Sequence, residues 1–379
     1  MGMSSVNICE SSNFRCDSSC HGRYSNAFLI EQPLSHIKRW DILLDEVLRL
    51  LCQTAYLTVS YHNIGPHASN ALIKKFLGRR YQYSISQAEE WHDKKSGRYI
   101  STFHVSKLFP DRYRADSWSF CILTNGNKED IVKSFCESVR SQKDGNKHQI
   151  LIFSSKAGIG LEYNAEYINI DGLVDSWGEI SKKKNELAKR ASGENLVLAH
   201  DRYTLSANFV ESFDKYGYDF DYLTIPQYYE SGAIYPSLNG IESPPLMWKK
   251  VYFTSEYSKY PPNPFVNGGF IIVKRDTIRD IRFNELNNWN QAEDVELGLA
   301  MNNVSLPPRV NTLTKAITHG ITEEYTKYIF DINLKKTRRS IKLILRMLIQ
   351  LIAMIVEALN FFIRVQIFIK NDIQRKIDQ

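Results

Sequence analysis

Residues 195–202 read NLVLAHDR, an apolar run that ends abruptly in three polar residues. The run predicts a buried strand over 195–199, because short apolar segments bounded by polar residues are typical of strands that are covered on both faces. His200, Asp201 and Arg202 then lie at the carboxyl end of this strand. In open α/β sheets, ligands bind at that end. The stretch therefore predicts both the type of sheet and the position of its site.

Three earlier apolar runs repeat the pattern, at 120–124, 149–153 and 167–170. Helical spacing of apolar residues over 131–139 and a charged helix over 179–191 separate them. Strands that alternate with helices predict a mainly parallel sheet. Polar residues follow each strand, and we expect them to meet at one edge of the sheet: Thr124, Asn125, Ser154, Asp171 and Asp201.

The second half of this region is less regular. Residues 219–264 are rich in Tyr and Pro, which is typical of a binding loop. A Gly268-Gly269 turn then leads into an apolar strand, and the stretch WNQAEDVEL at 289–297 opens a helix. His319 follows close to the end of the predicted domain.

The order of these motifs resembles the glycosyltransferases of the GT-A fold. The resemblance is closest to the inverting, family 2-like group with a galactosyltransferase-like Gly-Gly, Glu-Asp and His pattern at its C-terminal end. It covers residues 117–330 of the 379-residue chain. It implies a Rossmann-like, mainly parallel catalytic domain. It also implies a hexosyltransferase that moves a sugar from a nucleotide-sugar donor, a UDP-sugar above all, to a glycan or lipid-linked acceptor.

The resemblance assigns a role to each motif. Asp201 and His319 would bind a divalent metal, with Mn²⁺ preferred and Mg²⁺ as the alternative, to neutralise the leaving diphosphate. The catalytic residues would be Asp294, as the general base, and the adjacent Glu293, which would bind an acceptor or donor hydroxyl. Trp289 and Gln291 would bind the acceptor. The residues implied for the donor are Thr124, Asn125, Ser154, Asp171, Lys184, Asn185, His200, Arg202, Gly268 and Gly269.

Structural roles are open for the same residues. Asp201 stands alone where the family carries Asp-x-Asp, and it could cap a turn or pair with Arg202. Glu293 and Asp294 could stabilise a helix N-terminus. Two other functions therefore stay open. One is a nucleotidyltransferase, which shares this type of sheet, and the other is a degenerate sugar-binding or scaffold module.

Flanking regions complete the domain plan. Residues 1–30 form a polar, Ser-rich lead that we expect to be loose. Residues 31–116 form a small accessory α/β unit, with helices near 37–51 and 71–77 and strands at 56–61 and 99–105. Residues 331–379 form a C-terminal amphipathic helical tail.

The tail is basic at its start and apolar over 341–369, with its polar residues on one narrow stripe. Such a helix binds an anionic membrane surface, here through 334–369, or packs on the accessory unit or on a second copy in a homo-oligomer. The net charge of +6 does not indicate a nucleic-acid partner. Without an evident signal peptide, we expect a cytoplasmic protein attached peripherally to the inner face of a membrane, active in polysaccharide biosynthesis.

Overall fold

The computed structural model describes residues 8, 13–109, 116–154, 156, 158–169, 178–241, 251–254, 256–257, 259–288 and 291–324. The chain divides into two units, Met1–Ile321 and Thr322–Gln379, and the elements below all belong to the first. Asp171, Trp289 and the predicted tail helix lie outside the described residues. No helix within the described ranges is long and apolar enough to cross a membrane.

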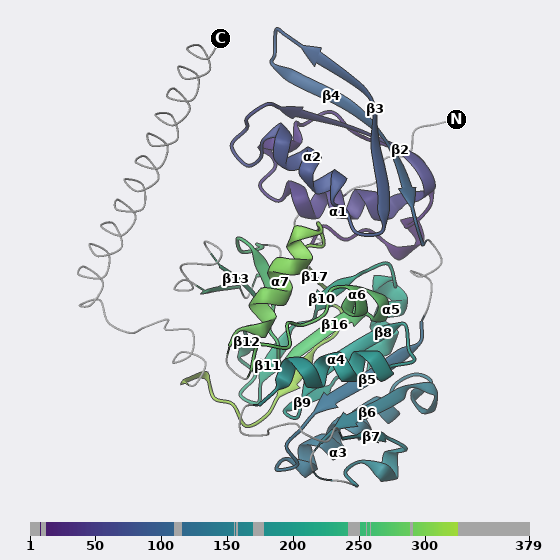
Figure 1. The fold of residues 1–379 in the computed structure, drawn as a ribbon, viewed down its shortest axis with the longest axis vertical. Helices are drawn as coiled ribbons and strands as arrows, with labels where there is room; N and C mark the ends of the chain where they lie inside the picture. Colours follow the sequence, from purple (N-terminus) through teal and green to yellow (C-terminus); the bar gives the residue numbers. More distant parts are fainter. Residues whose placement is uncertain are drawn as a thin grey trace, which may run out of the picture. The chain divides into compact units, whose positions relative to one another are not determined.

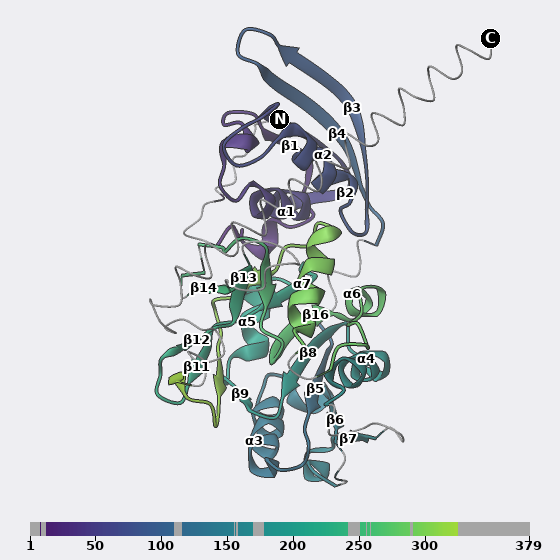
Figure 2. The same ribbon diagram turned by 60° about the vertical axis from the view of Figure 1, so that its left-hand side comes forward.

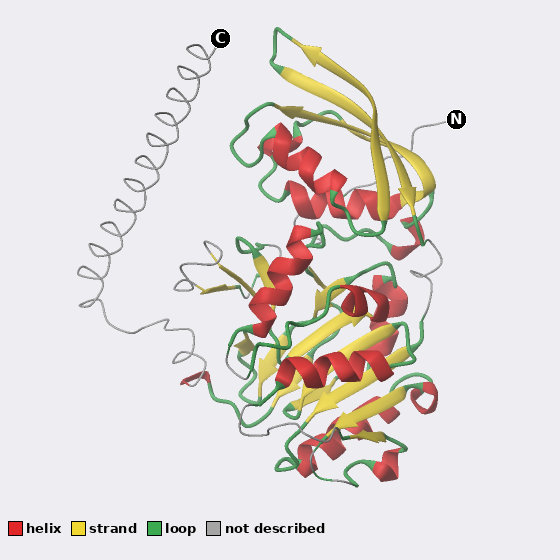
Figure 3. Ribbon diagram, in the orientation of Figure 1, coloured by secondary structure: helices red, strands yellow, loops and turns green. Residues whose placement is uncertain are grey.

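The accessory unit is a four-stranded sheet with two helices on one face (Figure 3). Apolar residues of both helices and of alternate strand positions, such as Leu48, Ile73 and Val59, form one buried cluster. The elements, with strands in sheet order, are β1 (Tyr24–Leu29), β2 (Leu51–His62), β4 (Arg98–Lys107), β3 (Tyr83–Asp93), α1 (Trp40–Leu50) and α2 (Asn70–Gly78).

The lead is more ordered than its composition indicates. Tyr24–Leu29 pairs in parallel with β2, and Phe14 and Cys16 are buried at 3% and 8% exposure. Our prediction of a loose lead is therefore wrong for the described residues from Asn13 onward. Phe14 reaches the core of the accessory unit, and neighbouring polar groups are bonded to distant residues: Asn13 donates to the carbonyl of Val310 at 2.8 Å.

A seven-stranded sheet forms the centre of the larger part of the chain (Figure 1). Four of its neighbouring pairs are parallel, whereas β16 runs antiparallel to both of its neighbours. The predicted mainly parallel α/β sheet is thus confirmed. In sheet order its strands are β17 (Arg309–Val310), β10 (Tyr222–Thr224), β16 (Phe270–Lys274), β8 (Asn195–His200), β5 (Trp118–Leu123), β6 (Gln149–Phe153) and β7 (Glu166–Ile168).

Helices cover both faces of this sheet, which explains why its central strands are apolar throughout. Phe120 and Ile122 of β5 pack with α3 (Glu129–Arg140) and α5 (Phe209–Tyr216) on one face. Cys121 and Leu123 pack on the other face, against a second group of helices. These are α4 (Ile180–Arg190), α6 (Arg275–Asp280) and α7 (Glu293–Asn303).

Two small sheets complete the fold beside the carboxyl ends of the central strands. The first, in order, contains β12 (Ile234–Tyr235), β11 (Gln227–Tyr229), β18 (Ala316–Thr318) and β9 (Tyr203–Leu205). The second contains β14 (Val251–Phe253), β13 (Leu238–Ile241) and β15 (Pro264–Val266). The irregular, aromatic stretch of the sequence thus forms short strands rather than one long loop.

A buried ionic network joins the accessory unit to the central sheet. At its centre, the Asp45 carboxylate lies 3.0 Å from Arg49, 2.8 Å from Arg80 and 2.7 Å from Arg309. The Arg49 guanidinium also reaches Asp219 at 2.8 Å. Further pairs around this centre involve Arg15, His21, Glu46, Lys107 and Asp221. The two parts therefore share one polar core, while the domain boundary near residue 116 stays a prediction.

Candidate active site

The carboxyl ends of β5 and β8 bring together two of the predicted residues. Thr124 and Asp201 follow neighbouring parallel strands, and the Thr124 hydroxyl donates to the Asp201 carboxylate at 2.8 Å. The same hydroxyl accepts a hydrogen bond from the Gly126 amide at 3.0 Å. The carboxylate stays partly open to solvent, with 17% of its side chain exposed. The edge of the sheet thus carries an accessible carboxylate in a fixed orientation.

The Gly268-Gly269 turn connects this edge to the start of α7. A Cβ on Gly268 would lie 2.8 Å from the Glu293 carboxylate and 2.9 Å from the Asp294 Cβ. A Cβ on Gly269 would lie 2.3 Å from the Arg202 guanidinium. A side chain at either position would have to displace these neighbours, so the two glycines allow the close approach seen here. At this turn, the Arg202 side chain that follows β8 and the carboxylates at the start of α7 come close to the same backbone segment.

Two carboxylates at the start of α7, those of Glu293 and Asp294, lie next to the Gly268-Gly269 segment. Asp294 accepts from the Gly268 amide at 2.8 Å, and Glu293 accepts from Lys184 at 3.0 Å. The fully buried Lys184 ammonium also donates to the Gly268 carbonyl at 2.8 Å. Ala292, directly before the helix, has a left-handed φ of 61°, an uncommon conformation for a residue with a side chain. A strained residue and a buried cation thus position the pair.

The electrostatic setting of Asp294 suits a base. Burial raises the pKa of its carboxyl to about 6, and the Glu293 charge adds to the rise. The Gly268 amide and the Lys184 charge act in the opposite direction. The group is only half-buried, so it stays within reach of a ligand. At neutral pH it is ionised and can accept a proton.

His200 contributes a neutral imidazole next to Asp201. Burial and the charges of Lys184, Arg202 and Lys128 hold its pKa well below its usual range. Its Nε2 atom is buried and has no hydrogen-bond partner among the described residues. Buried polar atoms without a partner are rare, so this one is a candidate contact for a ligand.

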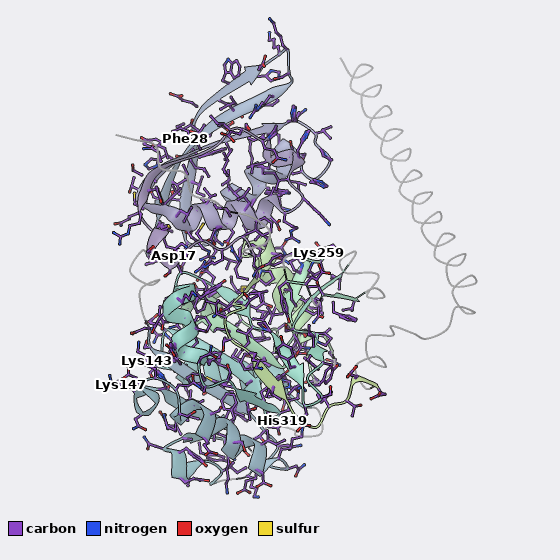
Figure 4. All side chains as sticks on the ribbon, turned by 180° about the vertical axis from the view of Figure 1, so that it is seen from behind. Asp17, Phe28, Lys143, Lys147, Lys259 and His319 are labelled. Atoms are coloured by element: carbon purple, nitrogen blue, oxygen red, sulfur yellow. The ribbon has the colours of Figure 1, made fainter. Side chains whose placement is uncertain are left out.

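The two residues of the predicted metal pair, Asp201 and His319, come from neighbouring segments, because the His319 amide donates to the Arg202 carbonyl at 2.7 Å. His319, labelled in Figure 4, has both ring nitrogens engaged: Nδ1 lies 2.9 Å from Glu230 and Nε2 lies 2.9 Å from the Thr204 hydroxyl. Asp201 is bonded to Thr124 and lies 4.0 Å from the Lys128 ammonium. Within the described ranges, no three His, Cys, Asp or Glu side chains gather where they could hold a metal. The metal role of Asp201 and His319 stays a prediction, and no step proposed below depends on it.

Other predicted residues have local partners. The Asn125 side chain accepts from the Asn127 amide, and the buried Ser154 hydroxyl accepts from the Lys156 amide, so both shape the ends of their strands. Asn185 bonds to the Phe283 backbone and to Glu285, so it connects α4 to the segment that follows α6. The exposed Gln291 accepts from the Asn288 amide. Binding roles for these four residues stay predictions.

The sequence reasoning missed three residues of the site. Lys128 lies 4.0 Å from Asp201 and places a cation at the sheet edge. Tyr235 and Asn267 surround the turn, since the Tyr235 hydroxyl accepts from Arg202 and from Asn267 at 3.4 Å each. The sequence position of Lys128 could have identified it, because it follows the Asn125-Gly126 turn at the end of a predicted strand. Tyr235 was one of many tyrosines in an irregular stretch.

Comparison with known proteins gives low-scoring structural similarities. No family model and no curated protein sequence matches the chain. Among solved structures, the chain is similar to S. aureus TarS 1-349, with 13% identity and a TM-score of 0.36 over 56% of this chain and 69% of that one.

Two further structures show the same level of similarity. GalNAc-T7, solved with UDP, GalNAc and Mn²⁺, has 13% identity and a TM-score of 0.42 over 53% of this chain and 43% of that one. TarS 1-349 in complex with UDP-GlcNAc has 13% identity and a TM-score of 0.37 over 54% and 60%. These values decide neither the fold nor the function of this chain.

Proposed function

We propose that this chain is a glycosyltransferase of the GT-A type that moves a hexose from a UDP-sugar to a glycan or lipid-linked acceptor with inversion. One observation carries the proposal. A half-buried carboxylate with a pKa near 6, that of Asp294, is held by the Gly268 amide beside the carboxyl ends of a mainly parallel sheet. That edge is where such sheets bind nucleotides.

The proposed reaction uses this carboxylate as a general base. An acceptor hydroxyl attacks the anomeric carbon of the donor and loses its proton to Asp294. A new glycosidic bond forms on the opposite face of the sugar, and the bond to the nucleoside diphosphate breaks. Lys184 and Glu293 act as positioning residues, because they hold the Gly268 carbonyl and the first turn of α7 in place.

The leaving diphosphate needs positive charge. Lys128 and Arg202 supply this charge at the sheet edge. Lys128 lies 4.0 Å from Asp201, and Arg202 directly follows Asp201 in the sequence. His200 offers its unpartnered Nε2 to a phosphate or ribose oxygen. A nucleotidyltransferase would use the same edge, but it has no need of a base at a helix start on the far side of the Gly-Gly turn. Sugar transfer is therefore favoured.

A panel of nucleotide sugars tests the proposal. Thermal unfolding with UDP-, GDP-, CDP- and dTDP-sugars shows which donor stabilises the folded chain, since only a ligand of the native state raises the melting temperature. Release of nucleoside diphosphate with that donor then reports turnover. A scaffold module would show a shift without turnover, and a chain that responds to no nucleotide sugar contradicts the proposal.

We expect the rate to depend on pH through Asp294. Its raised pKa of about 6 means that the base is protonated, and inactive, below that pH. The value of kcat/KM should therefore fall about tenfold per pH unit below pH 6 and level off above it. Donor affinity measured over the same range is the control. A rate that stays flat down to pH 4.5 would show that Asp294 is not the base.

Metal assistance stays a prediction, and Asp201→Ala with and without EDTA decides it. If a cation links Asp201 to the diphosphate, the variant should bind UDP about tenfold more weakly in Mn²⁺, and EDTA should lower wild-type affinity equally. Asp214→Ala, which removes an exposed carboxylate on α5, is the control. Unchanged or tighter UDP binding by Asp201→Ala would mean that Lys128 and Arg202 neutralise the phosphate without a metal.

The membrane assignment is part of the same proposal. A basic amphipathic segment at 334–369 would bring the enzyme to an anionic surface, where lipid-linked acceptors of polysaccharide synthesis are found. Flotation of the full chain and of a chain ending at residue 333 with anionic liposomes separates this role from packing within the protein.

A further inference from the structure

A cavity lies apart from the site around Asp294. It has a volume of about 530 Å³ and opens between the accessory helices and the end of α7. Its lining comes from the start of α1, one side of α2, the segment before β15 and the last turn of α7. The charged and aromatic lining residues include Lys38, Arg39, Trp40, Lys75, Arg79 and Tyr260.

Positive charge dominates this cavity. Four cationic side chains line it, and Asp41 is the one carboxylate among the described lining residues. That carboxylate is already bound to Arg39 at 2.9 Å. Arg39 is fixed further by a bond of 2.9 Å to the Pro261 carbonyl. Lys75 and Arg79 are exposed and lie one helical turn apart. The Lys75 ammonium and the Arg79 guanidinium can therefore both reach one anion.

Aromatic rings and amides supply the rest of the lining. Trp40 packs edge-on against Phe76 at 5.5 Å, and the Tyr260 ring lies under the Arg39 guanidinium at 5.1 Å. Asn302 is held by a bond from its amide to the Pro264 carbonyl. A pocket with aromatic walls and a few placed polar groups suits an organic ligand with rings rather than a bare ion.

Helix α7 links this cavity to the candidate base. Glu293 and Asp294 form its first turn, and Asn302 and Asn303 of its last turn line the cavity. Eleven helical residues span roughly 16 Å at about 1.5 Å per residue. Figure 2 shows α7 running from the central sheet to the accessory helices. An extended chain of sugars that lies along α7 would reach both places.

We propose that this cavity binds a negatively charged glycan and anchors the acceptor while one of its hydroxyls reaches Asp294. The acceptor role rests on the proposed function, whereas binding of the glycan does not. The accessory unit then has a task of its own: it supplies the charged half of the acceptor site.

Binding of three probes tests the proposal. Titration calorimetry compares a heparin-derived tetrasaccharide, neutral cellotetraose and inorganic phosphate. We expect the anionic tetrasaccharide to bind at least about tenfold more tightly than either of the others, and to weaken between about 50 and about 300 mM salt. If phosphate binds as tightly as the tetrasaccharide, the cavity is a simple anion site and the proposal is wrong. The proposal is also wrong if the tetrasaccharide does not bind.

Matched variants locate the binding. Lys75→Gln/Arg79→Gln should lower the affinity for the tetrasaccharide about tenfold or more, because both cations line the cavity. Lys74 is on the same helix but outside the lining, and it pairs with Glu90. Lys74→Gln should therefore change the affinity for the tetrasaccharide by less than about twofold. Equal losses in both variants would place the probe elsewhere. Asp294→Asn should bind the tetrasaccharide as the wild type does, so an inactive enzyme and a missing glycan site are distinguishable.

Discussion

Replacement of Asp294 by asparagine is expected to lower the rate of sugar transfer by about 10²–10⁴-fold, the usual contribution of a general base. The amide keeps the size of the carboxylate and can still accept the hydrogen bond that Gly268 donates at 2.8 Å. It cannot accept a proton. We therefore expect the loss in kcat, with the affinity for the donor nearly unchanged.

Glu296→Gln is the matched control for this variant. Glu296 lies on the same helix, is exposed, and bonds to the Asn284 side chain rather than to the Gly-Gly turn. Its replacement should leave the rate within about twofold of the wild type. If Asp294→Asn loses donor binding and turnover equally, Asp294 holds the donor and the base must be sought elsewhere.

Asp45→Ala is expected to destabilise the fold by about 3–5 kcal/mol, a large part of the stability of an ordinary domain. The side chain is fully buried and lies within 3.0 Å of three arginines. Without it, Arg49, Arg80 and Arg309 face one another with too little negative charge nearby. The free energy of unfolding in urea measures the effect.

Asp41→Ala provides the comparison, because Asp41 is also on α1 and also pairs with an arginine, but 26% of its side chain is exposed. A pair of this kind contributes about 1 kcal/mol or less. Asp45→Asn serves if the alanine variant does not fold, since the amide keeps part of the hydrogen bonding. Equal stability of the Asp45 and Asp41 variants would show that the network is not the junction described above.

The central sheet could be predicted from the sequence because its strands are buried on both faces. Short continuous apolar runs such as 120–123 and 150–153, bounded by polar residues, are typical of strands covered on both faces. β1 could not be predicted, since Ser25 and Asn26 interrupt its apolar residues and no residue of the strand is fully buried. β3 was missed for a similar reason, as most of its residues are exposed.

The candidate site was predictable where it depends on strand ends. Thr124 and Asp201 meet because they follow neighbouring parallel strands. The alternation of strands and helices in the sequence already indicates a parallel sheet whose strand ends share one edge. The partners of His319 could not be predicted, because Thr204 lies in a short strand and Glu230 in the turn after β11, and neither segment has a clear pattern. Lys184 is a similar case: its buried pair with Glu293 joins residues 109 positions apart.

The ionic junction also constrains the order in which the chain can fold during synthesis. Asp45 and Arg309 are 264 positions apart, and Arg49 and Asp219 are 170 apart. A nascent chain that has emerged only as far as residue 116 carries Asp45, Arg49 and Arg80 without Asp221 or Arg309. Its first helices therefore cannot close their polar core until those later residues have emerged. Native assembly of the N-terminal part must wait for the strand at 309–310, which makes folding late, non-local and correspondingly slow.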